Sequence, residues 1–243
     1  MSKRLKFFLI HLSISLLIVL LVIELVFFVW YPAPLATAVD VKHIFLMILT
    51  IDVIIGPFLG LLVYKEGKKS LKFDLTVIIL LQLSALCYGV YSIEQGRPAW
   101  LAYSVDRFEL VRKNEIILEN INHVKPKFQQ VSWFNPQYVA VNFAKDVQQR
   151  NDDMFGEVLG GISLAQRPER YVNFADAKAQ LQKRAQPLEL LQQYNDKAVV
   201  KKTLAKYPQA TAFLPMKASA VDMTVLINKQ GEVVKIVDLR PWK

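Results

Sequence analysis

Cysteine and histidine are scarce in this sequence of 243 residues, which contains one cysteine, Cys87, and three histidines. A single cysteine excludes an intramolecular disulfide and a CxxC redox motif. The histidines, His11, His43 and His123, stand far apart and lack the spacing of zinc ligands. We therefore expect no disulfide scaffold and no metal site.

The sequence also lacks the short motifs of common enzyme classes. GxSxG, GxxxxGKS/T, HExxH and GxGxxG, which mark nucleophilic, nucleotide-binding and zinc-protease sites, are all absent. The adjacent acids Asp152 and Asp153 would point in different directions on a helix, so they suit a helix N-terminus better than a catalytic pair. We predict that the protein is not an enzyme, has no catalytic residue and holds no cofactor.

A dense basic stripe, which a nucleic-acid-binding protein would show, is missing as well. Thirty Lys and Arg residues against 21 Asp and Glu give a net charge of +9, but residues 94–243 carry 22 basic and 16 acidic residues. In the nearest basic cluster, apolar residues interleave at helical spacing, as on a solvated helix face. That cluster is Lys197, Lys201, Lys202 and Lys206. We expect no nucleic-acid partner.

Hydrophobic residues are abundant instead, at 53% of the chain with a mean hydropathy of +0.26. Three long apolar runs occupy residues 7–30, 43–64 and 74–93. Each is long enough to cross a hydrocarbon core of about 30 Å as a helix. The first run exceeds the 7–15 residues or so of a signal-peptide core and ends in the interfacial residues Trp30 and Tyr31. We predict a domain of three transmembrane helices over residues 1–93.

Basic residues predict the orientation of these helices. The N-terminus carries Lys3, Arg4 and Lys6, and the loop at 65–72 carries four lysines and one acid, whereas the loop at 31–42 is nearly uncharged. The positive-inside rule places the N-terminus and the 65–72 loop in the cytoplasm. Three crossings then place residues 94–243 in the periplasm of a bacterium with an inner and an outer membrane.

Two acids, Glu24 and Asp52, lie inside the apolar runs. An ionisable residue in a membrane span is costly and points to function. Either these acids contact a partner's membrane helix or relay protons or ions, or they are protonated or hydrogen-bonded within the chain and hold the three helices together. The candidate bonding residues are Gln82, Ser13, Ser15 and Thr50. Two acids are too few for a relay, but the other interpretations stay open.

Gly56, Pro57 and Gly60 follow Asp52 in the second run. Pro57 removes a backbone hydrogen bond and should kink the helix. The two glycines lie four residues apart on the face of Asp52, where they would let another helix approach closely. A partner helix and the chain's own helices are equally suitable occupants of this face.

Residues 94–243 are long enough for a domain of their own, and we predict an α+β fold with four or five strands and three or four helices. Its clearest element is a C-terminal hairpin, because 223–228 and 232–239 alternate in polarity around Lys229-Gln230-Gly231. Other extended segments are expected at 101–111, with a turn or bulge at Asp106-Arg107, and at 137–143 and 213–216. Helices are expected at 146–159, 176–186, 187–194 and 196–206, and a loop at 166–174. The segment 114–120 is compatible with a further short helix.

Several residues of the 94–243 segment suit a protein interface, where arginine and tryptophan are favoured. Packing within the domain is the alternative interpretation. The candidates are Arg97, Asp106, Arg107, Arg170 and Trp242.

An ordered set of landmarks gives the sequence a family resemblance. Starting from the basic N-terminus and three spans, it runs through Thr50-Ile51-Asp52, Gly56-Pro57-Phe58, Gly96-Arg97-Pro98, Val105-Asp106-Arg107-Phe108, Arg167-Pro168-Glu169-Arg170-Tyr171, Phe213-Leu214-Pro215 and Pro241-Trp242. Over essentially its whole length the chain resembles the TfpX/TfpZ-type type IV pilin accessory proteins of Gram-negative bacteria, for which FimB-like names also occur.

The resemblance implies an inner-membrane protein that serves a particular pilin and promotes its stability or its assembly into pili. The implied partners are the major pilin, inner-membrane lipid and other pilus assembly proteins, and no catalytic residue is implied. Asp52, with Glu24 as an alternative, is the hypothetical contact for the pilin's membrane helix, through a hydrogen bond that involves the protonated Asp52 carboxyl group. Two alternative functions stay open. The protein could be a membrane-tethered enzyme that modifies pilin or another envelope substrate, or it could be a periplasmic ligand sensor.

Overall fold

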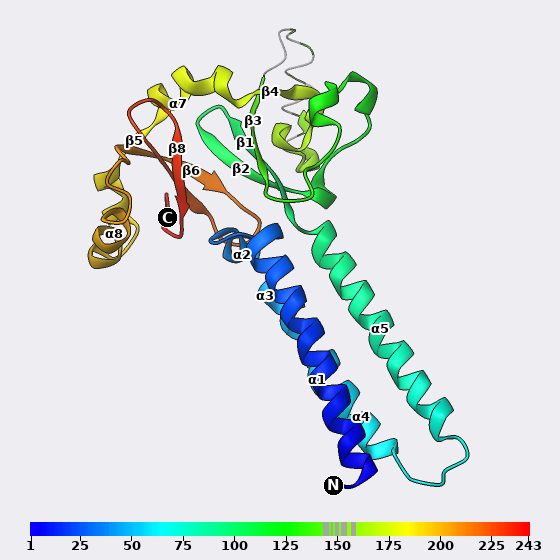
Figure 1. Ribbon diagram of the computed structural model, residues 1–243. Helices are drawn as coiled ribbons and strands as arrows, with labels where there is room; N and C mark the ends of the chain where they lie inside the picture. Colours follow the sequence, from blue (N-terminus) through cyan, green and yellow to red (C-terminus); the bar gives the residue numbers. More distant parts are fainter. Residues whose placement is uncertain (143–145, 147, 149–150, 152–154, 157–158) are drawn as a thin grey trace. The chain divides into compact units, whose positions relative to one another are not determined.

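The computed structural model describes residues 1–142, 146, 148, 151, 155–156 and 159–243 (Figure 1). By their internal contacts these residues form two units. We call the first the helical unit; it comprises Met1–Ala33 and Val41–Gly96. The second, the sheet unit, comprises Pro34–Asp40 and Arg97–Lys243. The chain therefore passes between the units at three points along the sequence.

Three long helical segments form the helical unit, as predicted (Figure 1). All three are long and apolar enough to cross a membrane, judged by length and composition. Their parts are α1, Lys3–Glu24, with the π-helical η1, Leu25–Trp30; α3, Lys42–Leu49, with the π-helical η2, Thr50–Ile55, and α4, Gly56–Val63; and α5, Leu71–Gln95.

Local sequence accounts for the ends of these segments. The Ser2 hydroxyl caps α1 by accepting a hydrogen bond from the Leu5 N–H at 3.3 Å. The loop between α4 and α5 includes Gly67 at a φ of +78°, which glycine adopts without a steric penalty. The middle segment packs against both α1 and α5 (Figure 1), so it lies at the centre of the helical unit.

The sheet unit is built on one mixed sheet of eight strands. The strand order is β4-β3-β1-β2-β6-β7-β8, and β5 pairs with β6. The β1–β3 and β2–β6 pairs are parallel and the others are antiparallel. The strands are β1, Pro98–Ser104; β2, Arg107–Arg112; β3, Gln137–Val141; β4, Tyr171–Asn173; β5, Gln186–Pro187; β6, Ala212–Lys217; β7, Met223–Ile227; and β8, Val233–Val237.

Strand β1 is buried on both faces and divides the core in two. Successive strand side chains point to opposite faces. Leu101 and Tyr103 thus belong to one apolar cluster, with Phe108, and Trp100 belongs to the other, with Phe128 and Tyr171. The predicted turn inside 101–111 is a hairpin turn at residues 105 and 106 that joins β1 to β2.

The predicted C-terminal hairpin is confirmed as β7 and β8. Gly231 has a φ of +74°, as expected from its place in the turn. The Asn228 side-chain oxygen accepts hydrogen bonds from the N–H groups of Gln230 and Glu232, at 3.0 and 2.9 Å, and so stabilises the turn.

The predicted number of four or five strands was wrong. The extended segment 101–111 forms two strands, β1 and β2, and two short strands, β4 and β5, arise from tertiary packing. The segment 166–174, expected as a loop, contains β4 and the 3-10 helix Pro168–Arg170, and it begins where another 3-10 helix, Leu164–Gln166, ends. Tyr171 orders this segment: its ring packs 5.4 Å from the Trp100 ring between centroids, and its hydroxyl donates to the Ala165 carbonyl. Burial raises the pKa of Tyr171. A strand of three residues is too short for an alternating sequence pattern to predict it.

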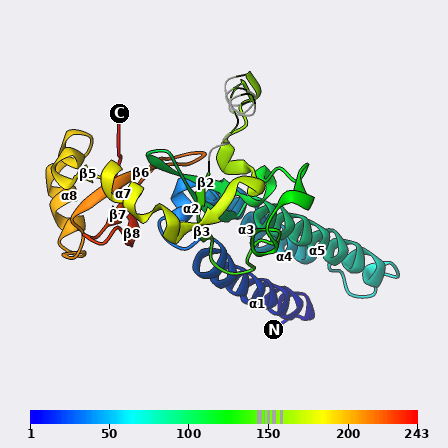
Figure 2. The same ribbon diagram turned by 90° about the horizontal axis from the view of Figure 1, so that it is seen from above.

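The helices of the sheet unit agree only in part with prediction. Asp196 caps α8, Lys197–Leu204, as expected, and α7, Lys178–Arg184, lies within the predicted 176–186. Val200 of α8 belongs to an apolar cluster with Phe213 of β6, Leu226 of β7 and Val237 of β8, and Figure 2 shows α8 at the end of the sheet that carries these strands. The helix expected at 187–194 and the short helix considered at 114–120 are instead 3-10 helices, Leu188–Gln193 and the short Lys113–Glu115. The expected helix at 146–159, with Asp152 and Asp153, falls largely outside the described residues.

A short helix from the N-terminal third of the sequence belongs to the sheet unit. This is α2, Leu35–Ala38, which follows the first long helix. Leu35 and Ala38 are buried in the cluster around Phe108, and the Ala38 carbonyl accepts hydrogen bonds from Ala220 and Val221 at 3.0 and 3.1 Å. The core of the sheet unit therefore includes residues from the connection between the first two spans.

Candidate functional site

The main chain around Asp52 departs from the α-helix just before Pro57. In the π-helical η2 the Gly56 N–H donates to the Ile51 carbonyl, five residues earlier. In the same register the Asp52 carbonyl would need the N–H of residue 57, which proline lacks. The missing N–H of Pro57 thus leaves the Asp52 carbonyl to other donors, and the kink expected at Pro57 stays a prediction.

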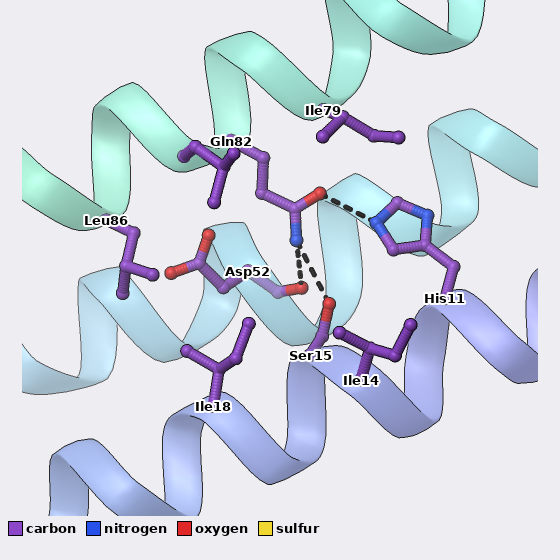
Figure 3. A pocket seen from close by; sticks show the side chains of 9 residues that line it. His11, Ile14, Ser15, Ile18, Asp52, Ile79, Gln82 and Leu86 are labelled. Carbon is purple, nitrogen blue, oxygen red and sulfur yellow. Dashed lines mark hydrogen bonds between the residues drawn. The ribbon is translucent and has the colours of Figure 1, made fainter.

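Gln82 of α5 provides that donor and joins the three helices (Figure 3). Its Nε2 lies 2.7 Å from the Asp52 carbonyl oxygen and 3.1 Å from the Ser15 hydroxyl, and its Oε1 lies 2.9 Å from His11 Nε2. A carbonyl only accepts hydrogen bonds, so the Gln82 NH₂ must face Asp52 and the Gln82 oxygen must face His11. His11 Nε2 therefore carries a proton and donates it to Gln82.

The glycine face beside Asp52 is occupied by the chain's own side chains. A Cβ on Gly56 would lie 2.1 Å from Gln82 Oε1, and a Cβ on Gly60 would lie 3.0 Å from Phe7. Both glycines and Pro57 are buried in the helical unit. The two glycines let α1 and α5 approach the middle segment closely, which is the intramolecular role considered above. Partner contact through these three residues stays a prediction.

The Asp52 carboxyl group lies apart from this network. Asp52 is 3% exposed, yet among the described residues neither carboxylate oxygen has a hydrogen-bond partner. Gln82 binds the main chain of Asp52, while the Ser13 and Thr50 hydroxyls donate to carbonyls of their own helices. None of the internal partners considered from the sequence bonds the carboxyl group. A buried polar group without a partner costs stability, and an ionisable one inside a membrane span points to a contact site.

The carboxyl group faces a cavity of about 190 Å³ in the helical unit (Figure 3). Asp52 extends into it from the middle segment, between α1 and α5. Most of the lining is apolar, and the lining residues are His11, Ile14, Ser15 and Ile18 of α1 and Ile79, Gln82, Leu83 and Leu86 of α5. The cavity thus has a mainly apolar lining and one buried carboxyl group without a hydrogen-bond partner among the described residues.

Glu24, the other acid in the spans, does not line this cavity. It is the last residue of α1, its side chain is exposed, and none of the described residues forms a hydrogen bond with it. The structure therefore separates the two acids that the sequence analysis had considered together, and Asp52 alone lies in a defined site.

The candidate interface residues of the sheet unit lie on several different elements. Arg97 is 2% exposed just before β1, Asp106 is exposed in the β1–β2 turn, and Arg107 forms an ion pair of 3.3 Å with Glu109. Arg170 ends a 3-10 helix, and the Trp242 indole donates to Asp222 at 2.7 Å. Arg97 and Trp242 have packing roles in the domain, and a partner role for the five residues stays a prediction.

Sequence reasoning missed His11, which the structure brings into the Gln82 network. One signal was available: His11 and Ser15 lie four residues apart in the first apolar run and so share one helix face. Polar residues at this spacing in a membrane span indicate a polar contact with a neighbouring helix.

Similarity to known proteins covers both units. Residues 1–39 match the family model described as fimbrial assembly protein FimB. The chain is 29% identical over 240 residues to the fimbrial assembly protein of serogroup I of Dichelobacter nodosus, covering 95% of this chain and 93% of that protein. The serogroup C1 and C2 protein is 35% identical over 114 residues, which cover 46% of this chain and 87% of that protein. No solved structure matches the chain.

Proposed function

The chain belongs to the FimB family of fimbrial assembly proteins, and on this premise we propose that it is a membrane accessory protein that binds a type IV pilin and promotes its stability or assembly. The observation that carries the proposal is the similarity to a fimbrial assembly protein over 95% of the chain. The family membership supports a role in pilus assembly. The TfpX/TfpZ type rests on the ordered landmarks of the sequence.

We place the protein in the bacterial inner membrane with the sheet unit in the periplasm. Residues 34–40 contribute to the core of the sheet unit, so the connection between the first two spans lies on the same side of the membrane as that unit. The second and third spans together make two crossings, which return the chain to the side of this connection. The basic N-terminus and the 65–72 loop then lie together on the cytoplasmic side.

Thiol labelling tests this orientation. In a Cys87→Ser background, Lys229→Cys in the exposed β7–β8 turn should react with a membrane-impermeant maleimide once the outer membrane is permeabilised. Lys69→Cys in the loop before α5 should react only after lysis. Labelling of Lys69→Cys in unlysed cells would contradict the proposed topology.

A non-catalytic function fits a partner-binding protein, and we retain it as part of the proposal. Deletion of the gene should lower the pilin level or the number of surface pili, and pilin should co-purify with the tagged protein from detergent-solubilised membranes. Loss of pilin itself indicates a chaperone role, whereas loss of pili with intact pilin indicates an assembly role.

The same experiment separates the other candidate functions. A modifying enzyme would change the mass of pilin in the wild type relative to the deletion strain. A ligand sensor would leave pilin mass, pilin level and co-purification unchanged. Normal piliation without the gene, together with no co-purifying pilin, would refute the proposal.

A further inference from the structure

We propose that the cavity in front of Asp52 is the binding site for a transmembrane helix of the partner, which donates a hydrogen bond to the Asp52 carboxyl group. Insofar as this partner is the pilin, the inference rests on the function proposed above. It adds the place of contact, between α1 and α5, and the chemistry of the group that binds there.

No described side chain donates a hydrogen bond to the Asp52 carboxyl group. Gln82 Nε2 already serves the Asp52 carbonyl and Ser15, and His11 Nε2 already serves Gln82. Both Asp52 carboxylate oxygens are buried and, among the described residues, unbonded. A donor from outside the chain would remove the energetic penalty of this group.

Exposed apolar side chains surround the buried acid on two helices. Ile14 of α1 is 53% exposed, and Ile79 and Leu83 of α5 are 40% and 45% exposed, although all three line the cavity around the buried acid. The middle segment lies behind the cavity (Figure 3). A helix that covers these apolar side chains would complete a four-helix arrangement with Asp52 in its interior, where polar groups in membrane proteins make their contacts.

Other occupants match the chemistry of the cavity less well than a helix does. A lipid acyl chain would fill the apolar part but leave the carboxyl group unpaired. A divalent cation would need several oxygen ligands, and no group of three metal-ligating side chains exists among the described residues. The cavity of about 190 Å³ exceeds the ~150 Å³ of an engineered cavity that admits benzene, so a large apolar side chain fits. A helix provides such a side chain together with a donor.

Site-specific photocrosslinking tests the place of contact. A photoreactive phenylalanine at position 83, inside the cavity, should crosslink to pilin, as detected with a pilin antibody. The matched control is position 81 on the same helix, which is 66% exposed but does not line the cavity and should give no pilin product. Positions 14 and 17 form the equivalent pair on α1, since Leu17 is 60% exposed outside the cavity.

Substitution of the acid tests the hydrogen bond. Asp52→Leu should lower pilin co-purification at least tenfold, because a buried hydrogen bond to a carboxyl group is lost. Asp52→Asn, which can still accept a hydrogen bond, should retain most of the binding. The melting temperature of Asp52→Leu in detergent should equal or exceed that of the wild type, since the chain loses an unbonded acid. If Asp52 served only to stabilise the chain, Asp52→Leu would have a lower melting temperature than the wild type.

The outcomes distinguish this inference from the proposed function. Pilin that co-purifies equally with wild type and Asp52→Leu, or that crosslinks equally at positions 81 and 83, would refute the binding site and leave the proposed function intact. Failure of pilin to co-purify with the wild type would refute both.

Discussion

At the scale of single residues, Gln82 decides how the helical unit is joined. One amide contacts Ser15 and His11 of the first span and the main chain of the second. The sequence places an acid in the second span and a glutamine in the third, and a bond between them is one of the interpretations that it leaves open. It does not indicate that the bond goes to the main chain, because that result depends on the π-helical turn and on the missing N–H of Pro57.

Gly56→Ala is expected to destabilise the helical unit. The new Cβ would lie 2.1 Å from Gln82 Oε1, so the Gln82 side chain must leave its hydrogen bonds. Overpacking of this kind costs about 1–3 kcal/mol. The melting temperature in detergent measures the change. Gly160→Ala is the control, because the nearest atom to its Cβ would lie 3.7 Å away, at an ordinary contact distance. Equal melting temperatures would show that the contact is not needed.

Buried tyrosines predict a loss of stability at alkaline pH. Burial raises the pKa of Tyr103 and Tyr138 to about 12, from an ordinary value near 10. Between pH 10 and 12 the unfolded chain loses these protons while the folded chain keeps them, so stability is complete below pH 10 and falls as the pH rises.

The corresponding variant is Tyr138→Phe, which keeps the ring packed on Phe174. Between pH 10 and 12 the free energy of unfolding of Tyr138→Phe should fall by about 2 kcal/mol less than that of the wild type. Denaturant unfolding at several pH values would measure the difference. An unchanged alkaline slope in Tyr138→Phe would contradict the assignment.

At the scale of elements, the sequence predicted those helices and strands that interactions between neighbouring residues stabilise. The apolar runs, the C-terminal hairpin and the capped helix α8 appear as expected because periodicity, turn residues and caps act within a few residues. Strands β4 and β5 were missed, since each consists of two or three residues that pair only when the rest of the sheet is present.

Asp196→Ala should shorten or weaken α8. The carboxylate accepts hydrogen bonds from the Ala198 and Val199 N–H groups at 2.9 and 3.0 Å. Loss of such a cap costs about 1 kcal/mol. Urea unfolding would measure the change, with Lys201→Ala on the exposed side of the same helix as the control. A midpoint shift equal to that of Lys201→Ala would show that the cap contributes nothing.

At the scale of the whole molecule, the connection between the first two spans belongs to the core of the sheet unit. Ala38 is fully buried there and its carbonyl accepts two hydrogen bonds. Ala38→Asp should therefore destabilise the sheet unit by roughly 2–4 kcal/mol, because it buries an unpaired charge. Protease resistance of the sheet unit would show the change.

The control for Ala38→Asp is Ala33→Asp, because Ala33 is exposed five residues earlier. Equal protease resistance of the two variants would mean that the sheet unit folds without residues 34–40. A greater sensitivity of Ala38→Asp would show that the membrane-proximal segment and the C-terminal residues fold as one cooperative unit.

The sequence by itself determined the three apolar spans, their expected direction, the C-terminal hairpin and the presence of an acid in the second span. These follow from periodicity, charge distribution and turn chemistry, which are local. Only the tertiary structure decided that Gln82 bonds the Asp52 main chain, that the carboxyl group is left facing a cavity, and that residues 34–40 complete the sheet core. Each of these depends on which distant segments meet, and packing in three dimensions sets that choice.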